Sequence, residues 1–412
     1  MDNLTQPQIW IRTKCIQLPH AALALATVLV MAAVVAKSAQ AQKYSVLYSF
    51  AGGKDGANPV AGLVRDSKGN LYGTTNQGGG HGYGTVFEVD STGKKTLLHS
   101  FEDNREDGAY PWAGLVLDGK GNLYGTTLNG GYYNWGTVFE VDTAGTMTVL
   151  YSFGSAGGDG AYPYAGLLRD TKGNLYGTTF EQGAYGYGTV FELNSEGKET
   201  VLYSFKGTRG DGANPYAGVV RDTTGNLYGT TYEGGLEGCD NVGCGVVFKL
   251  DTTGKESLLH TFTGTRGDGA NPSGGLVRDA KGNLYGTTRF PASGGTVFKV
   301  DDTGKETVLY AFTGWSDGNE PFNENLVLDA KGNLYGTTEQ GGDLACNAGY
   351  GCGTVFQVDA TGKETVLHSF TGDGGDGVGP LAGLVLDAEG NLYGTTAYGG
   401  AYGYGTVFKL TP

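Results

Sequence analysis

Aromatic side chains that could stack on a ligand are concentrated in the Gly-rich segments of this sequence, beside Asn, Gln and Glu. A flat ring can stack on the apolar side of a sugar while neighbouring amides and carboxylates hydrogen-bond its hydroxyls. The alternative is that these rings are structural, packing between units or holding loops in place. The candidate ligand-binding residues are Trp112, Tyr133, Trp135, Tyr164, Tyr187, Tyr216, Tyr232, Trp315, Phe322, Tyr404 and His81.

Two glutamates, Glu320 and Glu324, are weak candidates for a catalytic pair. They stand in the segment Glu-Pro-Phe-Asn-Glu-Asn, which replaces a Pro-x-Ala-Gly pattern that is usual elsewhere in the chain. Glycosidases need two carboxyl groups about 5 to 10 Å apart, so a carbohydrate-active hydrolase or lyase is one hypothesis. A loop that has drifted in sequence without acquiring a role is the other.

The histidines and the Asp-Gly pairs do not assemble a reactive site. His99, His260 and His368 occupy places where equivalent segments carry Tyr, and we interpret them as strand residues at an outer edge. An Asp-Gly pair recurs at one equivalent position of each of the seven units, which is typical of turns and not of one asymmetric active site. These pairs begin at Asp55, Asp107, Asp159, Asp211, Asp268, Asp317 and Asp376. We therefore predict no metal site, no Ser-His-Asp triad and no cofactor.

One repeated unit has to position all of these side chains. The heptapeptide Gly-Asn-Leu-Tyr-Gly-Thr-Thr occurs seven times, each time followed by Gly-Thr-Val-Phe or a near match. Each unit contains four short runs typical of strands, expected in the first unit at 61–66, 70–75, 84–90 and 95–101. Four antiparallel strands repeated seven times predict an all-β fold, a seven-bladed β-propeller. The predicted units are about 60–101, 112–153, 164–205, 216–262, 273–312, 322–370 and 381–410 plus 43–50.

The two ends of the repeat region together complete one unit. Residues 43–50 resemble a fourth strand without the first three, and 381–410 supply three strands without a fourth. We expect the N-terminal strand to complete the last blade and close the ring. Asp-x-x-Gly turns join the first strand to the second and the third to the fourth, so both turns of a blade lie on one face. The opposite face carries the longer, variable loops, where we expect recognition.

The unit Gly-Leu-Val-x-Asp-x-x-Gly-Asn-Leu-Tyr-Gly-Thr-Thr followed by Gly-Thr-Val-Phe resembles the GloVer tandem repeat of exported bacterial proteins. It is more loosely similar to the NHL and two-component-regulator propeller repeats. The resemblance covers residues 43–410. It implies an exported propeller, often with a separate surface anchor, and no established activity. Since the sequence stops at Pro412 directly after its last strand, we expect no C-terminal anchor.

Residues 1–41 are predicted to be a signal peptide, leaving 42–412 as the propeller. Arg12 and Lys14 precede an apolar run, and Ala39-Gln40-Ala41 supplies a small-x-small cleavage pattern. The alternative is an uncleaved anchor. No second apolar run follows, so we expect no membrane span in the mature chain and a periplasmic or extracellular location.

Four cysteines lie beyond the leader in two local pairs, Cys239 with Cys244 and Cys346 with Cys352. An oxidising compartment favours a disulfide within each pair. The alternative is one zinc ion held by four thiolates, but the repeat places the two pairs two units apart, too far to share a tetrahedral site.

The charge balance narrows the possible partners. Forty-two acidic and 28 basic residues give a net charge of −14, which argues against nucleic-acid binding. We expect a monomer that binds a glycan or an extracellular protein without catalysis. The alternatives are a hydrolase or lyase that uses carboxylates near the channel mouth, and a purely structural surface protein.

Overall fold

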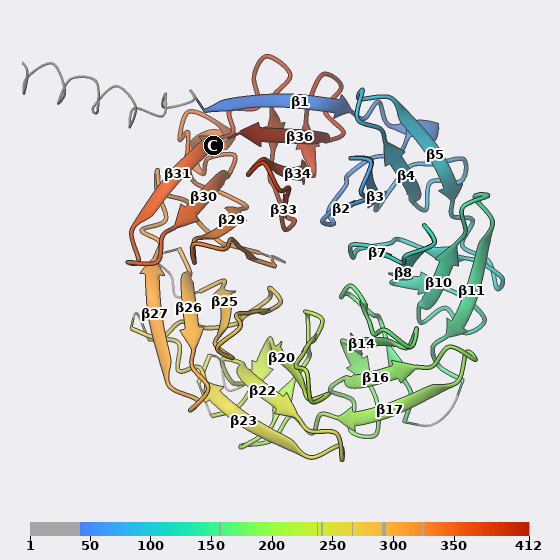
Figure 1. Cartoon of the computed structure of the whole chain (residues 1–412), viewed down its shortest axis with the longest axis vertical. Helices are drawn as coiled ribbons and strands as arrows, with labels where there is room; N and C mark the ends of the chain where they lie inside the picture. Colours follow the sequence, from blue (N-terminus) through green and yellow to red (C-terminus); the bar gives the residue numbers. More distant parts are fainter. Residues whose placement is uncertain are drawn as a thin grey trace, which may run out of the picture. The chain divides into compact units, whose positions relative to one another are not determined.

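Seven four-stranded antiparallel sheets follow one another around a central axis in the computed structural model, as Figure 1 shows. The structure describes residues 42–155, 158–236, 238–239, 242–265, 267–290, 294–322 and 325–411. The predicted signal peptide and Glu324 lie outside the described residues. The prediction of a seven-bladed β-propeller with four strands per blade is confirmed.

Each blade runs from an inner strand at the axis to an outer strand at the perimeter (Figure 1). Blades 1 to 3 contain β2 (Val64–Arg65), β3 (Leu71–Thr75), β4 (Thr85–Val89) and β5 (Lys95–Ser100); β7 (Val116–Leu117), β8 (Leu123–Thr127), β10 (Thr137–Val141) and β11 (Met147–Ser152); and β13 (Leu168–Arg169), β14 (Leu175–Thr179), β16 (Thr189–Leu193) and β17 (Glu199–Ser204). Blades 4 and 5 contain β19 (Val220–Arg221), β20 (Leu227–Thr231), β22 (Val246–Leu250) and β23 (Glu256–Thr261); and β24 (Val277–Arg278), β25 (Leu284–Thr288), β26 (Thr296–Val300) and β27 (Glu306–Ala311). Blades 6 and 7 contain β28 (Val327–Leu328), β29 (Leu334–Thr338), β30 (Thr354–Val358) and β31 (Glu364–Ser369); and β33 (Val385–Leu386), β34 (Leu392–Thr396), β36 (Thr406–Thr411) and β1 (Lys43–Ser49).

The remaining elements are short and lie in the long loops. They are β6 (Gly108–Ala109), β9 (Asn129–Gly130), β12 (Gly160–Ala161), β15 (Glu181–Gln182), β18 (Gly212–Ala213), β21 (Glu233–Gly234), β32 (Gly377–Val378), β35 (Tyr398–Gly399) and the 3₁₀ turns η1 (Gly53–Asp55) and η2 (Asn347–Gly349). These two turns are the only helical segments among the described residues, and neither is long or apolar enough to cross a membrane.

The N-terminal strand closes the ring. β1 pairs antiparallel with β36, with Val46 opposite Phe408 and Tyr48 opposite Val407. β1 thereby becomes the outer strand of blade 7, and the predicted closure is confirmed. Since this pairing joins the two ends of the chain, blade 7 has the same four strands as the other blades.

The inner strands are shorter than the sequence predicts. The first was expected at 61–66, but only Val64–Arg65 pair in the sheet. The chain before them lines the axis, where neighbouring blades crowd together: a Cβ on Gly114 would lie 3.1 Å from the carbonyl oxygen of Gly62. This segment is therefore used to line the channel and not to extend the ladder.

Phenylalanine pairs hold adjacent blades together. The Phe that follows each outer strand packs edge-on against the Phe of the third strand in the next blade, with ring centroids 5.0 to 5.4 Å apart. Almost every atom of both rings is buried, and burying one such ring contributes roughly 1.5–3 kcal/mol. The pairs are Phe50–Phe87, Phe101–Phe139, Phe153–Phe191, Phe205–Phe248, Phe262–Phe298, Phe312–Phe356 and Phe370–Phe408.

The Asp-x-x-Gly turns have the chemistry predicted from the sequence. The Oδ1 atom of Asp66 accepts hydrogen bonds from the N–H groups of Lys68 and Asn70, at 2.9 and 2.8 Å. Gly69 closes the turn with a φ of 92°, which a residue with a side chain rarely adopts. Asp90 makes the equivalent bonds between the third and fourth strands. These aspartates are turn residues.

Candidate ligand-binding site

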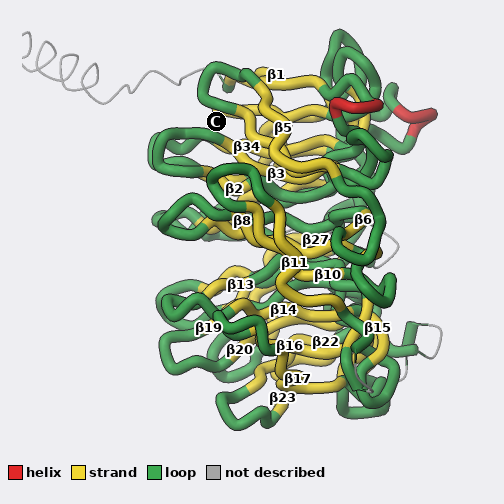
Figure 2. The backbone as a smooth tube through the Cα atoms, turned by 90° about the vertical axis from the view of Figure 1, so that its right-hand side faces the viewer, coloured by secondary structure: helices red, strands yellow, loops and turns green. Residues whose placement is uncertain are grey.

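Both long loops of a blade lie on the same face, as the strand order predicts. In every blade the loop that carries the Asp-Gly pair and the loop between the second and third strands pair briefly with each other, as β6 does with β9. Figure 2 shows this long-loop face on its right-hand side, where β6 and β15 are labelled. The scaffold thus presents the variable loops together.

Seven residues surround the end of the central channel on this face, and we call them the mouth ring. Each follows a proline in the segment that leads to an inner strand. Each blade contributes one residue at the same position of the repeat. The size and polarity of the mouth therefore depend on the side chains at these seven positions. The mouth ring consists of Val60, Trp112, Tyr164, Tyr216, Ser273, Phe322 and Leu381.

The large side chains of the mouth ring pack against one another. Tyr164 stacks on Tyr216 with ring centroids 4.7 Å apart and meets Trp112 edge-on at 6.0 Å. Phe322 contacts Tyr216 at 5.6 Å even though blade 5 lies between their blades. That contact is compatible with the small side chain of Ser273, which is the blade 5 member of the ring and is 1% exposed. The result is a continuous arc of aromatic rings.

A cavity of about 330 Å³ lies along the axis beside this arc. Its wall includes Trp112, Tyr164 and Tyr216 together with glycines from six blades. In blade 6 the glycine position holds Asn325 instead, and its Oδ1 atom occupies space that a Cβ on Gly275 would need. Asn325 is exposed. It places a polar side chain in the channel wall at a position where the other six blades have glycine and contribute only backbone.

Charged side chains border the arc at blades 5 and 6. Arg289 donates hydrogen bonds to Glu320 Oε2 from Nε, at 3.0 Å, and from Nη2, at 2.6 Å. Its Nη2 atom also lies 3.9 Å from an oxygen of Glu339, and its guanidinium carbon lies 4.4 Å from the ring centroid of Phe322. This cluster therefore combines a cation, two carboxylates and an aromatic face.

Burial sets the protonation behaviour of this cluster. The pKa of Glu339 is raised, first by burial and then by the charge of Glu320, although Arg289 acts in the opposite direction. Burial alone would lower the pKa of Arg289, but the two glutamates outweigh it and the pKa is raised. Arg289 therefore stays positively charged, whereas Glu339 holds its proton more readily than an ordinary glutamate does.

The structure divides the predicted binding residues into groups. Trp112, Tyr164, Tyr216 and Phe322 belong to the mouth ring, and Tyr232 packs on Tyr216 with ring centroids 6.1 Å apart. His81 lies away from them, 3.6 Å from Glu102 Oε1, with both side chains exposed. Trp315 is 63% exposed in the loop that follows β27.

The other predicted rings hold Gly-rich loops in place. A Cβ on Gly52 or Gly207 would lie 2.7 Å from the ring of Tyr404 or Tyr187 respectively. Trp135 covers Gly154 in the same manner, and Tyr133 lies beside it. The contacts of these four rings are those expected of aromatic side chains that hold loops in place.

Disulfides take the place of these rings in two blades. Cys239 pairs with Cys244 and Cys346 with Cys352, which confirms both predicted bridges and leaves none of these sulfurs for a zinc site. A Cβ on Gly264 would lie 3.2 Å from the sulfur of Cys244, just as a Cβ on Gly207 would meet Tyr187. Ring and disulfide therefore fill one position of the repeat.

Three residues of the mouth were missed in the sequence. Arg289 and Glu339 directly follow Gly-Thr-Thr, where other blades have Asn, Leu, Phe, Tyr or Ala, and Asn325 stands at the glycine of Pro-x-Ala-Gly. Aligning the seven units against one another would have exposed all three. Glu320 was a weak catalytic candidate, and its carboxylate is bound by Arg289; its proposed partner Glu324 lies outside the described residues.

Comparisons with known proteins agree with the fold. The family model of the Gloeobacter/Verrucomicrobia repeat matches residues 32–242, 156–350 and 240–412, which confirms the resemblance to the GloVer repeat. None of the curated proteins matches. The periplasmic gluconolactonase of Pseudomonas aeruginosa is 18% identical, with a TM-score of 0.49 over 76% of this chain and 85% of that one. A luciferin-regenerating enzyme is 12% identical, with a TM-score of 0.43 over 86% and 92%. Similarity at this level carries no information about the ligand of this chain.

Proposed function

The chain belongs to the Gloeobacter/Verrucomicrobia repeat family, and we propose that it is an exported, non-catalytic protein that binds the end of a glycan at the channel mouth. The observation that carries the proposal is that an aromatic arc, a cavity and the side chain of Asn325 meet at one end of the axis. Export is supported by the predicted leader and by the two disulfides, which are typical of oxidising compartments.

The chemistry of the mouth suits a sugar. Trp112, Tyr164 and Tyr216 offer apolar faces and edges, while the amide of Asn325 can both donate and accept hydrogen bonds. Arg289 and Glu339 add a donor and an acceptor at the rim. A volume of about 330 Å³ is at the lower end for ligand pockets, so it admits a terminal sugar and not a chain that threads the axis. The concave shape favours a glycan end over a protein surface.

The test is glycan-array binding by the chain expressed with its leader and purified as it is processed. We expect Trp112→Ala combined with Tyr216→Ala to weaken binding at least about fivefold, because each lost ring contact contributes roughly 0.5–1.5 kcal/mol. Asn325→Gly, which restores the residue found in the other six blades, should also weaken binding. Tyr132→Ala is the matched control, since Tyr132 is an exposed ring of the same face outside the mouth. Binding that survives the mouth variants, or no glycan bound at all, would contradict the proposal.

A hydrolase is the second candidate, and the observation that favours it is Glu339. This acid has a raised pKa beside Glu320 and Arg289, and Arg289 packs on Phe322 of the mouth ring. A carboxyl group with a raised pKa is suited to act as the general acid that protonates a leaving group. Release of free sugar from a bound glycan, abolished by Glu339→Gln while binding is retained, would establish catalysis in place of simple binding.

A further inference from the structure

The outer strands of successive blades follow one another around the perimeter (Figure 1). Where one outer strand ends and the next begins, three side chains come together, as the contacts of Asp55 and Asp268 show. The first is a Tyr or His near the end of an outer strand, and the second is the Asp of the following Asp-Gly pair. The third is the first residue of the next outer strand or, in β1, the second. In order, the seven junctions contain Tyr48, Asp55 and Lys95; His99, Asp107 and Met147; Tyr151, Asp159 and Glu199; Tyr203, Asp211 and Glu256; His260, Asp268 and Glu306; Tyr310, Asp317 and Glu364; and His368, Asp376 and Tyr44.

The aspartate is held in the same way at every junction, whereas the third residue changes. Asp55 accepts from the N–H of Ala51, and Asp268 from the N–H and hydroxyl of Thr263. The Tyr or His also hydrogen-bonds this carboxylate, as Tyr48 does with Asp55 Oδ1 at 2.7 Å and Tyr203 with Asp211 Oδ2 at 3.0 Å. The third residue therefore decides which charge faces a carboxylate of fixed position.

At the Asp55 junction that charge is a cation. The Nζ atom of Lys95 lies 2.9 Å from Asp55 Oδ1 and also donates to the carbonyl oxygen of Asp55. The Lys95 side chain is only 5% exposed, so its ammonium group is built into the junction. The repeat thus has room for a positive charge between the aspartate and the next outer strand.

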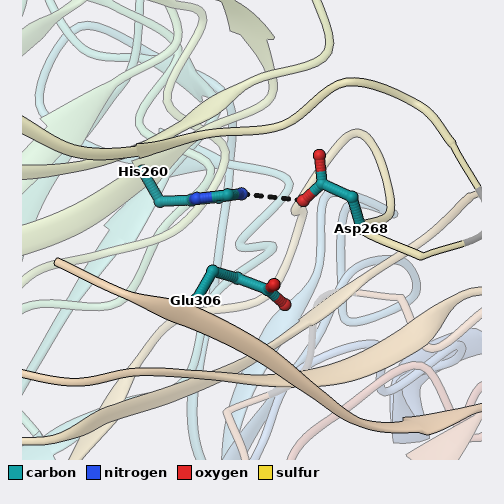
Figure 3. A group of neighbouring side chains, drawn as sticks. All are labelled: His260, Asp268 and Glu306. Atoms are coloured by element: carbon teal, nitrogen blue, oxygen red, sulfur yellow. Dashed lines mark hydrogen bonds and ion pairs between the residues drawn. The ribbon is translucent and has the colours of Figure 1, made fainter.

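At the Asp268 junction the same space is bordered by three ligand atoms. His260 Nε2 lies 2.7 Å from Asp268 Oδ1, and these atoms and a carboxylate oxygen of Glu306 all lie within 4.8 Å of one another. Figure 3 shows the three side chains converging from β23, from the loop after it and from β27. One oxygen of Glu306, Oε1, is buried and has no hydrogen-bond partner among the described residues.

This combination occurs once among the seven junctions, whose side chains are all described. The other two histidines face Met147 and Tyr44, and the other three glutamates face junctions that carry Tyr. Only at Asp268 do an imidazole and two carboxylates meet, and among the described residues no Lys or Arg forms an ion pair with these carboxylates. One nitrogen and two carboxylate oxygens are donors that suit zinc better than calcium, which takes oxygen ligands.

We propose that His260, Asp268 and Glu306 bind one Zn²⁺ ion that links the outer strands of blades 4 and 5. The ion takes the place that the ammonium group of Lys95 holds at the Asp55 junction. On binding, His260 Nε2 gives up to solvent any proton that it shares with Asp268, and its lone pair coordinates the metal together with one oxygen from each carboxylate. Water completes the coordination. The repeat pattern had predicted no metal site, since it indicated that His260 is a strand residue and Asp268 a turn residue.

The experiment is a Zn²⁺ titration by calorimetry of the processed chain, without an affinity tag and freed of metal with a chelator. We expect one equivalent to bind and to raise the unfolding temperature, because the ion binds only the folded junction. Glu306→Met copies the Asp107 junction and His260→Tyr copies the Asp211 junction, so both variants should fold. Each should weaken Zn²⁺ binding by at least about tenfold, since the loss of a ligand costs no less than the loss of an outer partner.

Two further variants separate this site from other carboxylates and histidines. Glu256→Gln removes a junction glutamate that has no histidine beside it and should leave the stoichiometry at one. Met147→Glu gives the Asp107 junction the same three residue types and should add a second equivalent. Failure of the unaltered chain to bind Zn²⁺, or binding that persists unchanged in Glu306→Met and His260→Tyr, would overturn the proposal. Tighter binding of Ca²⁺ than of Zn²⁺ would overturn the assigned metal.

Discussion

The turn face and the long-loop face are built from the same seven units, but only the long-loop face differs from blade to blade. On the turn face the Asp that ends each inner strand bonds the same partners, namely the backbone and side chain of Asn four residues later and the hydroxyl of Tyr six residues later. Asp222 repeats this arrangement with Asn226 and Tyr228. At the mouth ring, in contrast, equivalent positions hold residues as different as Trp112 and Ser273.

The difference between the two faces indicates which positions every blade needs in order to fold and which positions are free to vary. Every blade has to reverse its chain between strands, so every unit keeps the residues that make a tight turn possible. No blade needs a particular side chain at the mouth for its own folding. Variation concentrated at the mouth therefore indicates recognition more strongly than the aromatic content alone does.

Substitution on the turn face should produce the largest loss of stability. Asp222 accepts five hydrogen bonds, from the N–H and hydroxyl of Thr224, the N–H and side-chain amide of Asn226, and the hydroxyl of Tyr228. Asp222→Ala should lower the free energy of unfolding by about 3 kcal/mol, because several partners lose their acceptor at once. Urea denaturation measures this change. The folded variant should still bind ligand with unaltered affinity, and reduced affinity would show that the two faces are not independent.

Removing a disulfide of the long-loop face should lower stability by less than the Asp222→Ala substitution does. Cys346→Ser with Cys352→Ser opens a short loop and should cost about 2 kcal/mol of stability. Cys346→Ser with Cys352→Tyr should recover part of that loss, since a tyrosine ring covers the equivalent glycine in blades 3 and 7. Thermal unfolding of the two double variants makes the comparison. Equal stability of the two would mean that ring and disulfide are not equivalent at this position.

The sequence was sufficient for the fold because each unit carries its own turn residues and the two chain ends match. It also indicated Trp112, Tyr164, Tyr216 and Phe322, which share one position of the repeat. Periodicity gives the place of a residue within its unit, but it does not say which side chains of different blades meet. Arg289 reaches Glu320 across 31 residues, so this contact could not be read from the sequence pattern. The meeting of Asp268 with Glu306 was missed for the same reason.

The carboxyl groups of the turn face and those of the junctions between outer strands have pKa values shifted in opposite directions. For the turn aspartates, such as Asp170 and Asp222, burial acts to raise the pKa, but hydrogen bonds from the turn outweigh it and the pKa is lowered. Their contribution to stability is complete above the ordinary pKa of Asp and is lost as the pH falls further. At the junctions, burial and a facing aspartate raise the pKa of Glu199 and Glu364 to about 7.

Glu199→Gln should therefore have a small effect whose size depends on pH. The ordinary pKa of this group is 4.5, so between that value and about 7 the folded chain binds more protons than the unfolded chain. The free energy of unfolding then falls as the pH rises through this interval. Gln cannot ionise, so the variant should unfold about 2 °C higher than the unaltered chain at pH 8 and show no gain at pH 4.5. Solvent screening of this partly exposed side chain keeps the effect small. Glu196→Gln, an exposed substitution in the preceding turn, is the control and should show no such pH dependence. An equal gain at both pH values would mean that Glu199 is already protonated throughout or that its charge does not oppose folding.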